Sequence, residues 1–346
     1  MATVWFILIA LMLIVYVALD GFDFGAGIVH LYVARSDEER RTVLGAVAPV
    51  WDANEVWLIA AGGVSVFAFP RVYAAGFSGF YLPLIMVLWL LILRGLSIEF
   101  RSKEANPLWR RFWDAAFFLS SAALAVVFGA ALGNLIRGVP LDATGYFAGP
   151  LFTNWQPGAD AGVLDWYTIA VGILALVMLA THGALYVAWK TTGPVHERSQ
   201  ALARRLWPFV AVLTSIVTAL TFWVQPLIPY NLVARPFLWV VVLLIAGSFG
   251  WGRLAQRRGR ELQAFLASAA VICGLLTITA ATVYPSILIS TRDPAFSLTL
   301  ANAAGAPATL RIGLIWWVIA IILTIGYFVY LFRFFAGKVG STSEYH

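Results

Sequence analysis

The chain has 346 residues, of which 61% are hydrophobic and 12% charged, and its mean hydropathy is +0.85. These values lie far outside the range of soluble domains and indicate a polytopic membrane protein. The single cysteine excludes a disulfide framework, an iron–sulfur cluster and a thiolate zinc site within the chain. The net charge of +6 needs no nucleic-acid partner, because the loops between spans account for it.

Apolar stretches long enough to cross a bilayer recur along the whole chain. We therefore predict an all-α integral membrane protein of about nine transmembrane helices, forming a single transmembrane domain over residues 1–346. The first stretch has neither a basic start nor a small-residue cleavage site, which favours a retained span over a signal peptide. The predicted spans are residues 3–33, 45–69, 72–98, 112–136, 164–188, 206–224, 236–252, 263–287 and 312–335.

The basic residues alternate between loops and so predict the orientation of the chain. Eighteen of the 23 Lys and Arg residues lie in or beside the loops that follow the odd-numbered spans. Loops rich in Lys and Arg stay in the cytoplasm. We therefore predict an outside N-terminus and a cytoplasmic C-terminus, which an odd number of spans also requires.

Two pairs of carboxylates interrupt the first two spans. They are Asp20 and Asp23 in DGFDFGAG (20–27), and Asp52 and Glu55 in WDANEVW (51–57). Asp20 precedes the basic Arg35 by fifteen residues, which is about 22 Å along a helix and places Asp20 near the middle of the membrane. A charge at that depth costs several kcal/mol unless it is paired or hydrated, so both pairs are candidate functional groups.

The depth of Asp52 depends on where the second span begins, and the sequence leaves two starts open. If Pro49 is a first-turn residue, Asp52 lies at the cytoplasmic mouth; if the helix begins near Val43, Asp52 lies deeper. Arg94, in LILRGLSIEF, is a candidate charge partner for Asp52 or Glu55. One arginine cannot neutralise four carboxylates, so we favour a stepwise proton path from the cytoplasm over permanent ion pairing.

Two histidines and one further acid complete the set of candidate polar residues. His182 lies deep in the fifth span and is either a hydrogen-bonded proton relay or a haem ligand, whereas His30 lies near the basic loop. Asp114 stands at a span end beside Arg110 and Arg111, which predicts a surface ion pair. No combination of residues predicts a metal site in this chain.

Two features of the sequence bear on how the spans pack. The glycines Gly62, Gly63, Gly76 and Gly79 predict close helix contacts. A faint internal repeat aligns Asp20-Gly21 with His182-Gly183, and it predicts two four-helix bundles plus one peripheral helix. The halves would be parallel repeats, because both begin outside. They cover residues 1–136 and 164–287, and residues 312–335 form the extra C-terminal helix.

Long motifs in the first 140 residues resemble a known family. They are DGFDFGAG (20–27), ERR (39–41), APVWDANEVWLIAAGG (48–63), FPRVYAAGFSGFY (69–81), LRGLSIEFRSK (93–103), the W-x3-WD at 109–114 and GNLIRGVP (133–140). Together they resemble subunit II of cytochrome bd quinol oxidase, a terminal oxidase of aerobic respiration in the bacterial cytoplasmic membrane. Beyond residue 140 the resemblance rests mainly on the pattern of spans.

The resemblance implies a subunit without haem, paired with a homologous subunit I that carries haem b and haem d, oxidises quinol and reduces oxygen to water. It maps the proton-pathway aspartates of the family onto Asp20 or Asp23 and onto Asp52. Glu55 departs from the family pattern, since a Gln is common there. A structural quinone, membrane lipid and small single-span accessory subunits are further partners that the resemblance allows.

The sequence is compatible with two other functions. A proton-coupled secondary transporter would also need acids in the middle of the membrane, although such proteins usually show unwound helices and inverted repeats. A b-type cytochrome would bind its own haem through His182. Subunit I itself is disfavoured, because the chain lacks a GRQPW-type motif and has only a short loop after the sixth span.

Overall fold

The computed structural model describes residues 1–339, and these residues are mainly helical. Within them, eight helices are long and apolar enough to cross a membrane, and a pair of helices bent by 43° makes a possible ninth span. The predicted count of about nine is therefore reached when the bent pair acts as one span. The eight are α1 (Ala2–Val33), α5 (Tyr81–Phe100), α6 (Pro107–Arg137), α7 (Trp166–Lys190), α8 (Gly193–Val224), α10 (Leu238–Arg257), α11 (Glu261–Val283) and α13 (Pro307–Phe334); the bent pair is α2 (Asp37–Val47) and α3 (Trp51–Ala68).

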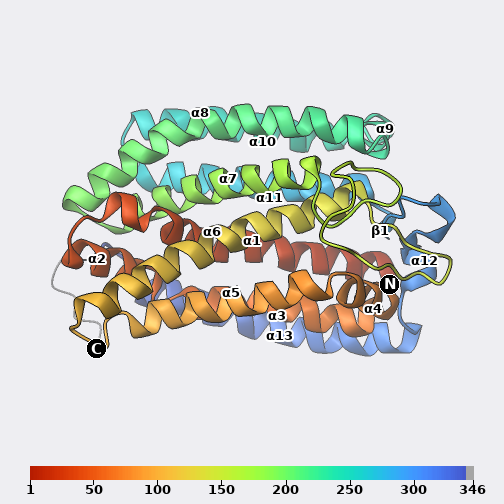
Figure 1. Ribbon diagram of the computed structural model, residues 1–346, viewed down its shortest axis with the longest axis horizontal. Helices are drawn as coiled ribbons and strands as arrows, with labels where there is room; N and C mark the ends of the chain where they lie inside the picture. The colour runs from red at the N-terminus through yellow and green to blue at the C-terminus, as the bar shows by residue number, and fades with distance from the viewer. Residues whose placement is uncertain (340–346) are drawn as a thin grey trace.

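Helix α1 lies inside the bundle (Figure 1). It packs against α3, α6, α7 and α11, and α7 packs in turn against α6, α8 and α11. Helices α8 and α10 lie along one edge of the bundle, and α3 and α13 lie along the opposite edge. The acids of α1 are thus enclosed by other helices, where a polar group needs a hydrogen-bond partner.

Glycines allow the central helices to approach closely. A Cβ atom on Gly25 of α1 or on Gly183 of α7 would overlap the backbone of the other helix, and one on Gly129 of α6 would lie 2.7 Å from the Cα of Gly172 on α7. Of the glycines predicted to make such contacts, Gly79 packs against the ring of Phe147. The prediction is wrong for Gly62, Gly63 and Gly76, which have no heavy atom of the described residues within 4 Å of a Cβ position.

The second and third predicted spans are both interrupted. Helix α2 ends before Pro49 and α3 begins two residues after it, so neither Pro49 nor Val43 begins the helix that carries the acids. Asp52 consequently stands in the first turn of α3. The predicted span 72–98 divides into α4 (Pro70–Gly79) and α5. Pro70 suits the start of α4, because the N–H of a first-turn residue has no acceptor within the helix and proline therefore loses no hydrogen bond there.

The two ends of the bundle differ. Helix α2 and the α5–α6 loop lie at one end, on the left of Figure 1, which we call the basic end. The N-terminus, α4, α9 (Leu227–Ala234) and α12 (Leu300–Ala303) lie at the other end, which we call the N-terminal end. A short hairpin that the sequence did not indicate also lies here. Its strands are β1 (Ser286–Leu288) and β2 (Leu298–Thr299), antiparallel with Ser286 opposite Thr299, and the 3₁₀ turn η1 (Pro294–Phe296) lies between them.

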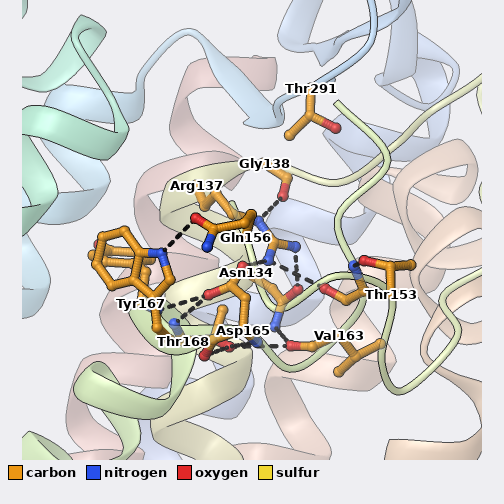
Figure 2. Close-up of polar contacts among 12 residues, drawn as sticks. Asn134, Arg137, Gly138, Thr153, Gln156, Val163, Asp165, Tyr167, Thr168 and Thr291 are labelled. Carbon is orange, nitrogen blue, oxygen red and sulfur yellow. Dashed lines mark hydrogen bonds and ion pairs between the residues drawn. The ribbon is translucent and has the colours of Figure 1, made fainter. Parts of the chain in front are cut away.

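A buried polar network joins α6, α7 and the loop between them at the N-terminal end (Figure 2). Arg137, the last residue of α6, forms an ion pair with Asp165 and donates to Asn134 Oδ1 at 2.7 Å. Asp165 is the N-cap of α7, and its Oδ1 accepts from the backbone N–H groups of Tyr167 and Thr168, both at 2.8 Å. The network therefore satisfies the first N–H groups of α7 and fixes the long loop to both helices.

Candidate functional site

Arg94 of α5 is the centre of the candidate site. Its Nη1 donates to Asp20 Oδ1 at 2.5 Å and its Nη2 to Asp20 Oδ2 at 3.2 Å, a two-point contact that orients both side chains. Nη2 also donates to Glu55 Oε2 at 2.8 Å. Arg94 and Asp20 are fully buried, whereas the Glu55 side chain is 19% exposed. Arg94 thus bridges α1 and α3, and among residues 1–339 its carboxylate partners are Asp20 and Glu55 rather than Asp52.

Asp23 has a different environment one turn further along α1. Its Oδ2 accepts from the side-chain amide of Asn54 at 2.8 Å, and its Oδ1 has no hydrogen-bond partner among the described residues. The side chain is fully buried and contacts no cation there. A buried carboxyl group that meets only an amide is well suited to hold a proton, because the protonated form avoids an uncompensated charge.

A surface groove of about 320 Å³ lies between α3 and α5. Glu55 and Asp52 line it from α3, and Glu99 lines it from α5. Within the part of the chain that the structure describes, Asp52 makes no hydrogen bond or ion pair, while Glu99 accepts from Trp51 Nε1 at 3.3 Å. Three carboxylates therefore line the groove, and one of them, that of Glu55, also binds Arg94.

Aromatic rings cover the Arg94 guanidinium. Its Cζ lies 4.4 Å from the ring centroid of Phe24 and 5.9 Å from that of Trp51. Gly95 leaves room for the indole, since a Cβ at that position would lie 3.0 Å from the Trp51 ring. Both rings favour the cation and limit the access of water to it.

His182 is a fully hydrogen-bonded side chain. Its Nδ1 lies 2.6 Å from Ser268 Oγ on α11, and its Nε2 lies 3.0 Å from the Ala18 carbonyl oxygen on α1. The ring stacks on Phe265 at a centroid distance of 4.7 Å. Because protein atoms engage both ring nitrogens, this arrangement does not fit an axial haem ligand, which needs one nitrogen facing the iron.

Asp114 belongs to a buried cluster at the basic end rather than to a surface ion pair. Arg101 Nε donates to its Oδ1 at 2.6 Å and Arg40 Nη1 to its Oδ2 at 2.7 Å, and Asp114 is 2% exposed. The predicted pairing with Arg110 is wrong, since Arg110 binds Asp37 at 2.9 Å. His30 joins the cluster, with Nε2 at 3.7 Å from Asp114 Oδ1. It is buried although it lies near the end of α1.

The four acids singled out in the sequence thus have three different surroundings. Asp20 and Glu55 share one guanidinium, Asp23 binds an amide, and Asp52 lies at the groove. Sequence reasoning did not single out Asn54 or Glu99. Asn54 directly precedes Glu55, and Glu99 follows Arg94 by five residues. Each of the two therefore lies close in sequence to a residue that had been identified as a candidate.

The sequence of the chain is similar to those of known proteins. The profile of the family described as "Cytochrome bd terminal oxidase subunit II" matches residues 1–335. The chain is 29% identical to "Probable cytochrome oxidase subunit 2" of Haemophilus influenzae, over 97% of this chain and 94% of the relative. It is 37% identical to "Cytochrome bd-I ubiquinol oxidase subunit 2" of Escherichia coli, over 62% of this chain and 54% of that protein.

Two further comparisons extend over nearly the whole chain. The chain is 29% identical to "Cytochrome bd ubiquinol oxidase subunit 2" of Bacillus subtilis, over 89% of this chain and 88% of the relative. A chain in the solved structure of the bd oxidase from Geobacillus thermodenitrificans superposes with a TM-score of 0.72 at 21% identity, covering 96% of this chain and 98% of that one. The superposition shows that the two chains share a fold.

Proposed function

The chain belongs to the family of subunit II of the cytochrome bd terminal oxidases, and from this premise we propose that its own part in the oxidase is to conduct protons from the basic end. Family membership favours this function over the secondary transporter and the b-type cytochrome that the sequence left open. The partner in the assembled oxidase is subunit I, and the multi-pass chain lies in the bacterial inner membrane.

The observation that carries the proposal is the groove that ends at the Arg94 ion pair. Glu55 faces the groove on one side and binds Arg94 on the other, and Arg94 binds the fully buried Asp20. Arg94 is the single guanidinium among the three carboxyl groups of Asp20, Asp23 and Glu55. An uncompensated charge inside a membrane costs several kcal/mol, so we infer that protons on these carboxyl groups balance the excess negative charge.

We assign the residues different roles along this path. Asp52 and Glu99 collect protons at the groove, Glu55 passes them inward, and Asp23 holds a proton in the interior. Asp20 keeps Arg94 neutralised, so it acts as a charge partner more than as a carrier. The sequence left Asp20 and Asp23 open as members of the path, and this assignment chooses Asp23 as the carrier.

The oxygen chemistry belongs to the partner in this proposal. Haem b and haem d would lie in subunit I and supply the electron transfer and oxygen reduction. The environment of His182 supports this division, because both ring nitrogens bind protein atoms. Among the described residues no group of three or more His, Cys, Asp or Glu is arranged to hold a metal ion.

We also propose the arrangement that the spans imply. The N-terminus is outside and the C-terminus cytoplasmic, with the basic end in the cytoplasm. The parallel halves 1–136 and 164–287 form two four-helix bundles, with α13 as the peripheral helix. The chain further scaffolds subunit I, and a structural quinone, lipid and single-span accessory subunits complete the assembly.

The test replaces Asp52 by Asn in the assembled oxidase reconstituted into vesicles. Asn keeps the shape of the side chain but cannot release a proton, so we expect turnover and proton uptake to fall roughly tenfold or more while the haem content stays constant. The matched control is Glu104→Gln, which removes an exposed acid of the α5–α6 loop. Wild-type proton uptake in Asp52→Asn, or a loss of haem, would contradict the proposed role.

A further inference from the structure

A second pocket lies at the basic end, away from the carboxylate groove. It is formed where α8, α10 and α11 meet beside α7, and its polar lining residues are Gln200, Arg204, Gln256, Arg260 and Glu261. None of them takes part in the proposed proton path. The pocket is therefore a separate feature whose chemistry needs its own explanation.

The amide of Gln256 points to a missing partner. Gln256 is 6% exposed, and among residues 1–339 neither its Nε2 nor its Oε1 has a hydrogen-bond partner. A buried amide without partners costs free energy, so such groups normally bind water or a ligand. Its position in the pocket lining gives that ligand a place to bind.

The beginning of α11 adds further donors at the same pocket. Its N-cap is Arg260, and no side chain caps the first backbone N–H groups of the helix. Gly259, with φ of +66°, makes the turn into the helix and also lines the pocket. An uncapped helix start carries a partial positive charge and free N–H groups, which together attract an anion.

The charges around the pocket favour an anion as well. Arg204 lines the pocket, and its Nη2 donates to Gln200 Oε1 at 3.2 Å and to the backbone carbonyl of Gln256 at 3.3 Å. Glu261 is the opposing charge, but Lys338 binds it at 2.8 Å and His196 lies 3.3 Å from it. The charge that remains at the pocket is the positive charge of Arg204 and Arg260.

We propose that this pocket binds a phosphate group, and that the phosphate belongs to an anionic phospholipid. The volume of the pocket is about 20 Å³, which admits one oxygen-sized group. One phosphate oxygen reaches Gln256, and the rest of the headgroup stays at the mouth between Arg204 and Arg260. Leu254 in the last turn of α10 and Leu262 in the first turn of α11 are exposed at the same end of these helices as the pocket and offer apolar surface for acyl chains. Basic pockets between membrane helices are known to bind such headgroups.

The test uses the intact oxidase purified in mild detergent and stepwise delipidated, with dioleoylphosphatidylglycerol as the probe and native mass spectrometry as the readout. We expect the wild type to retain one lipid, and Gln256→Glu and Arg204→Gln to need about tenfold more lipid for the same occupancy. Gln256→Glu keeps the size of the side chain while repelling the phosphate. Arg257→Gln is the matched control, because it removes the same charge from an exposed residue outside the pocket.

The other outcomes decide against the proposal in different ways. Equal weakening by Arg257→Gln and Arg204→Gln would overturn the site in favour of a diffuse charge effect. Unchanged retention in Gln256→Glu, with a normal size-exclusion profile, would also overturn it. If inorganic phosphate binds with the expected dependence on the variants while lipid retention does not depend on them, the lipid source is overturned and a soluble phosphate compound takes its place.

Discussion

At Arg94 a single guanidinium serves two carboxylates that differ in exposure. The contact with Asp20 is fully buried and has two points, whereas the contact with Glu55 has one point and reaches the groove. Removing one partner of a buried ion pair leaves an uncompensated charge, which costs about 3–5 kcal/mol. The two aspartates of α1 should therefore respond differently to the same substitution.

We predict that Asp20→Asn lowers the thermal stability and the yield of the oxidase, because Arg94 then retains only the partly exposed Glu55. Asp23→Asn should leave stability nearly unchanged, since Asn can still accept from the Asn54 amide, but it should lower proton uptake. Thermal unfolding of the purified oxidase and proton uptake in vesicles measure the two effects. Equal loss of stability in both variants would contradict the separation of roles.

At the scale of helices, α1 and α7 make a close backbone contact. Because Gly25 and Gly183 leave no space for a Cβ, the backbones approach more closely than side chains would allow, and His182 reaches the Ala18 carbonyl across this contact. Helices in membranes associate largely through such packing, since lipid provides no hydrophobic driving force between them. This interface should therefore be sensitive to a single methyl group.

We predict that Gly183→Ala destabilises the protein by about 2 kcal/mol or more, because the added methyl group overlaps the backbone of α1. Gly247→Ala on α10 is the control, since the described residues leave its Cβ position open. The melting temperatures of the two purified variants make the comparison. A Gly183→Ala protein as stable as the control would show that α1 and α7 can separate without loss.

The span pattern of the sequence predicted where most helices lie, because about twenty apolar residues are needed to cross a bilayer. It did not predict which glycines make contacts, since Gly62 and Gly183 look alike in sequence and differ only in the neighbour that each face meets. The break between α4 and α5 was missed for a related reason, and the break before α3 was indicated only by Pro49, as one of two open helix starts. Neither break interrupts the apolar run, so hydropathy carries no sign of it.

The candidate site was only partly accessible from the sequence. The acids were identified because a charge in an apolar run is costly and therefore informative. The partner of Asp20 was not identified, since Arg94 is 74 residues away and the third span could face Asp52 equally well. The position of Asp114 was misjudged because Arg110 is near in sequence, whereas Arg40 and Arg101 are near in space.

At the scale of the whole molecule, the two ends carry different amounts of charge. Seventeen of the 23 basic residues lie in or beside the loops of the basic end, since Arg94 is buried at the candidate site, while the N-terminal end carries the hairpin, α12 and the Arg137–Asp165 network. Much of α13 is apolar and exposed, and that helix packs mainly against α3. The sides of the molecule are therefore suited to contact lipid or a partner, and its two ends are suited to the aqueous phases on the two sides of the membrane.

The number of times that the chain crosses the membrane depends on the bent pair α2–α3. Eight long helices alone would return the chain to the side on which it began, and the termini lie on opposite sides only if the α2–α3 pair makes a ninth crossing. The basic residues require that ninth crossing, because moving Lys- and Arg-rich loops across the membrane is unfavourable.

We expect a fluorescent protein fused after His346 to fluoresce and alkaline phosphatase fused there to be inactive. Phosphatase inserted at the exposed Gly158 should be active. Active phosphatase at His346 together with inactive phosphatase at Gly158 would mean, for an outside N-terminus, that α2 and α3 turn back on one side, which would contradict the cytoplasmic mouth of the proposed path.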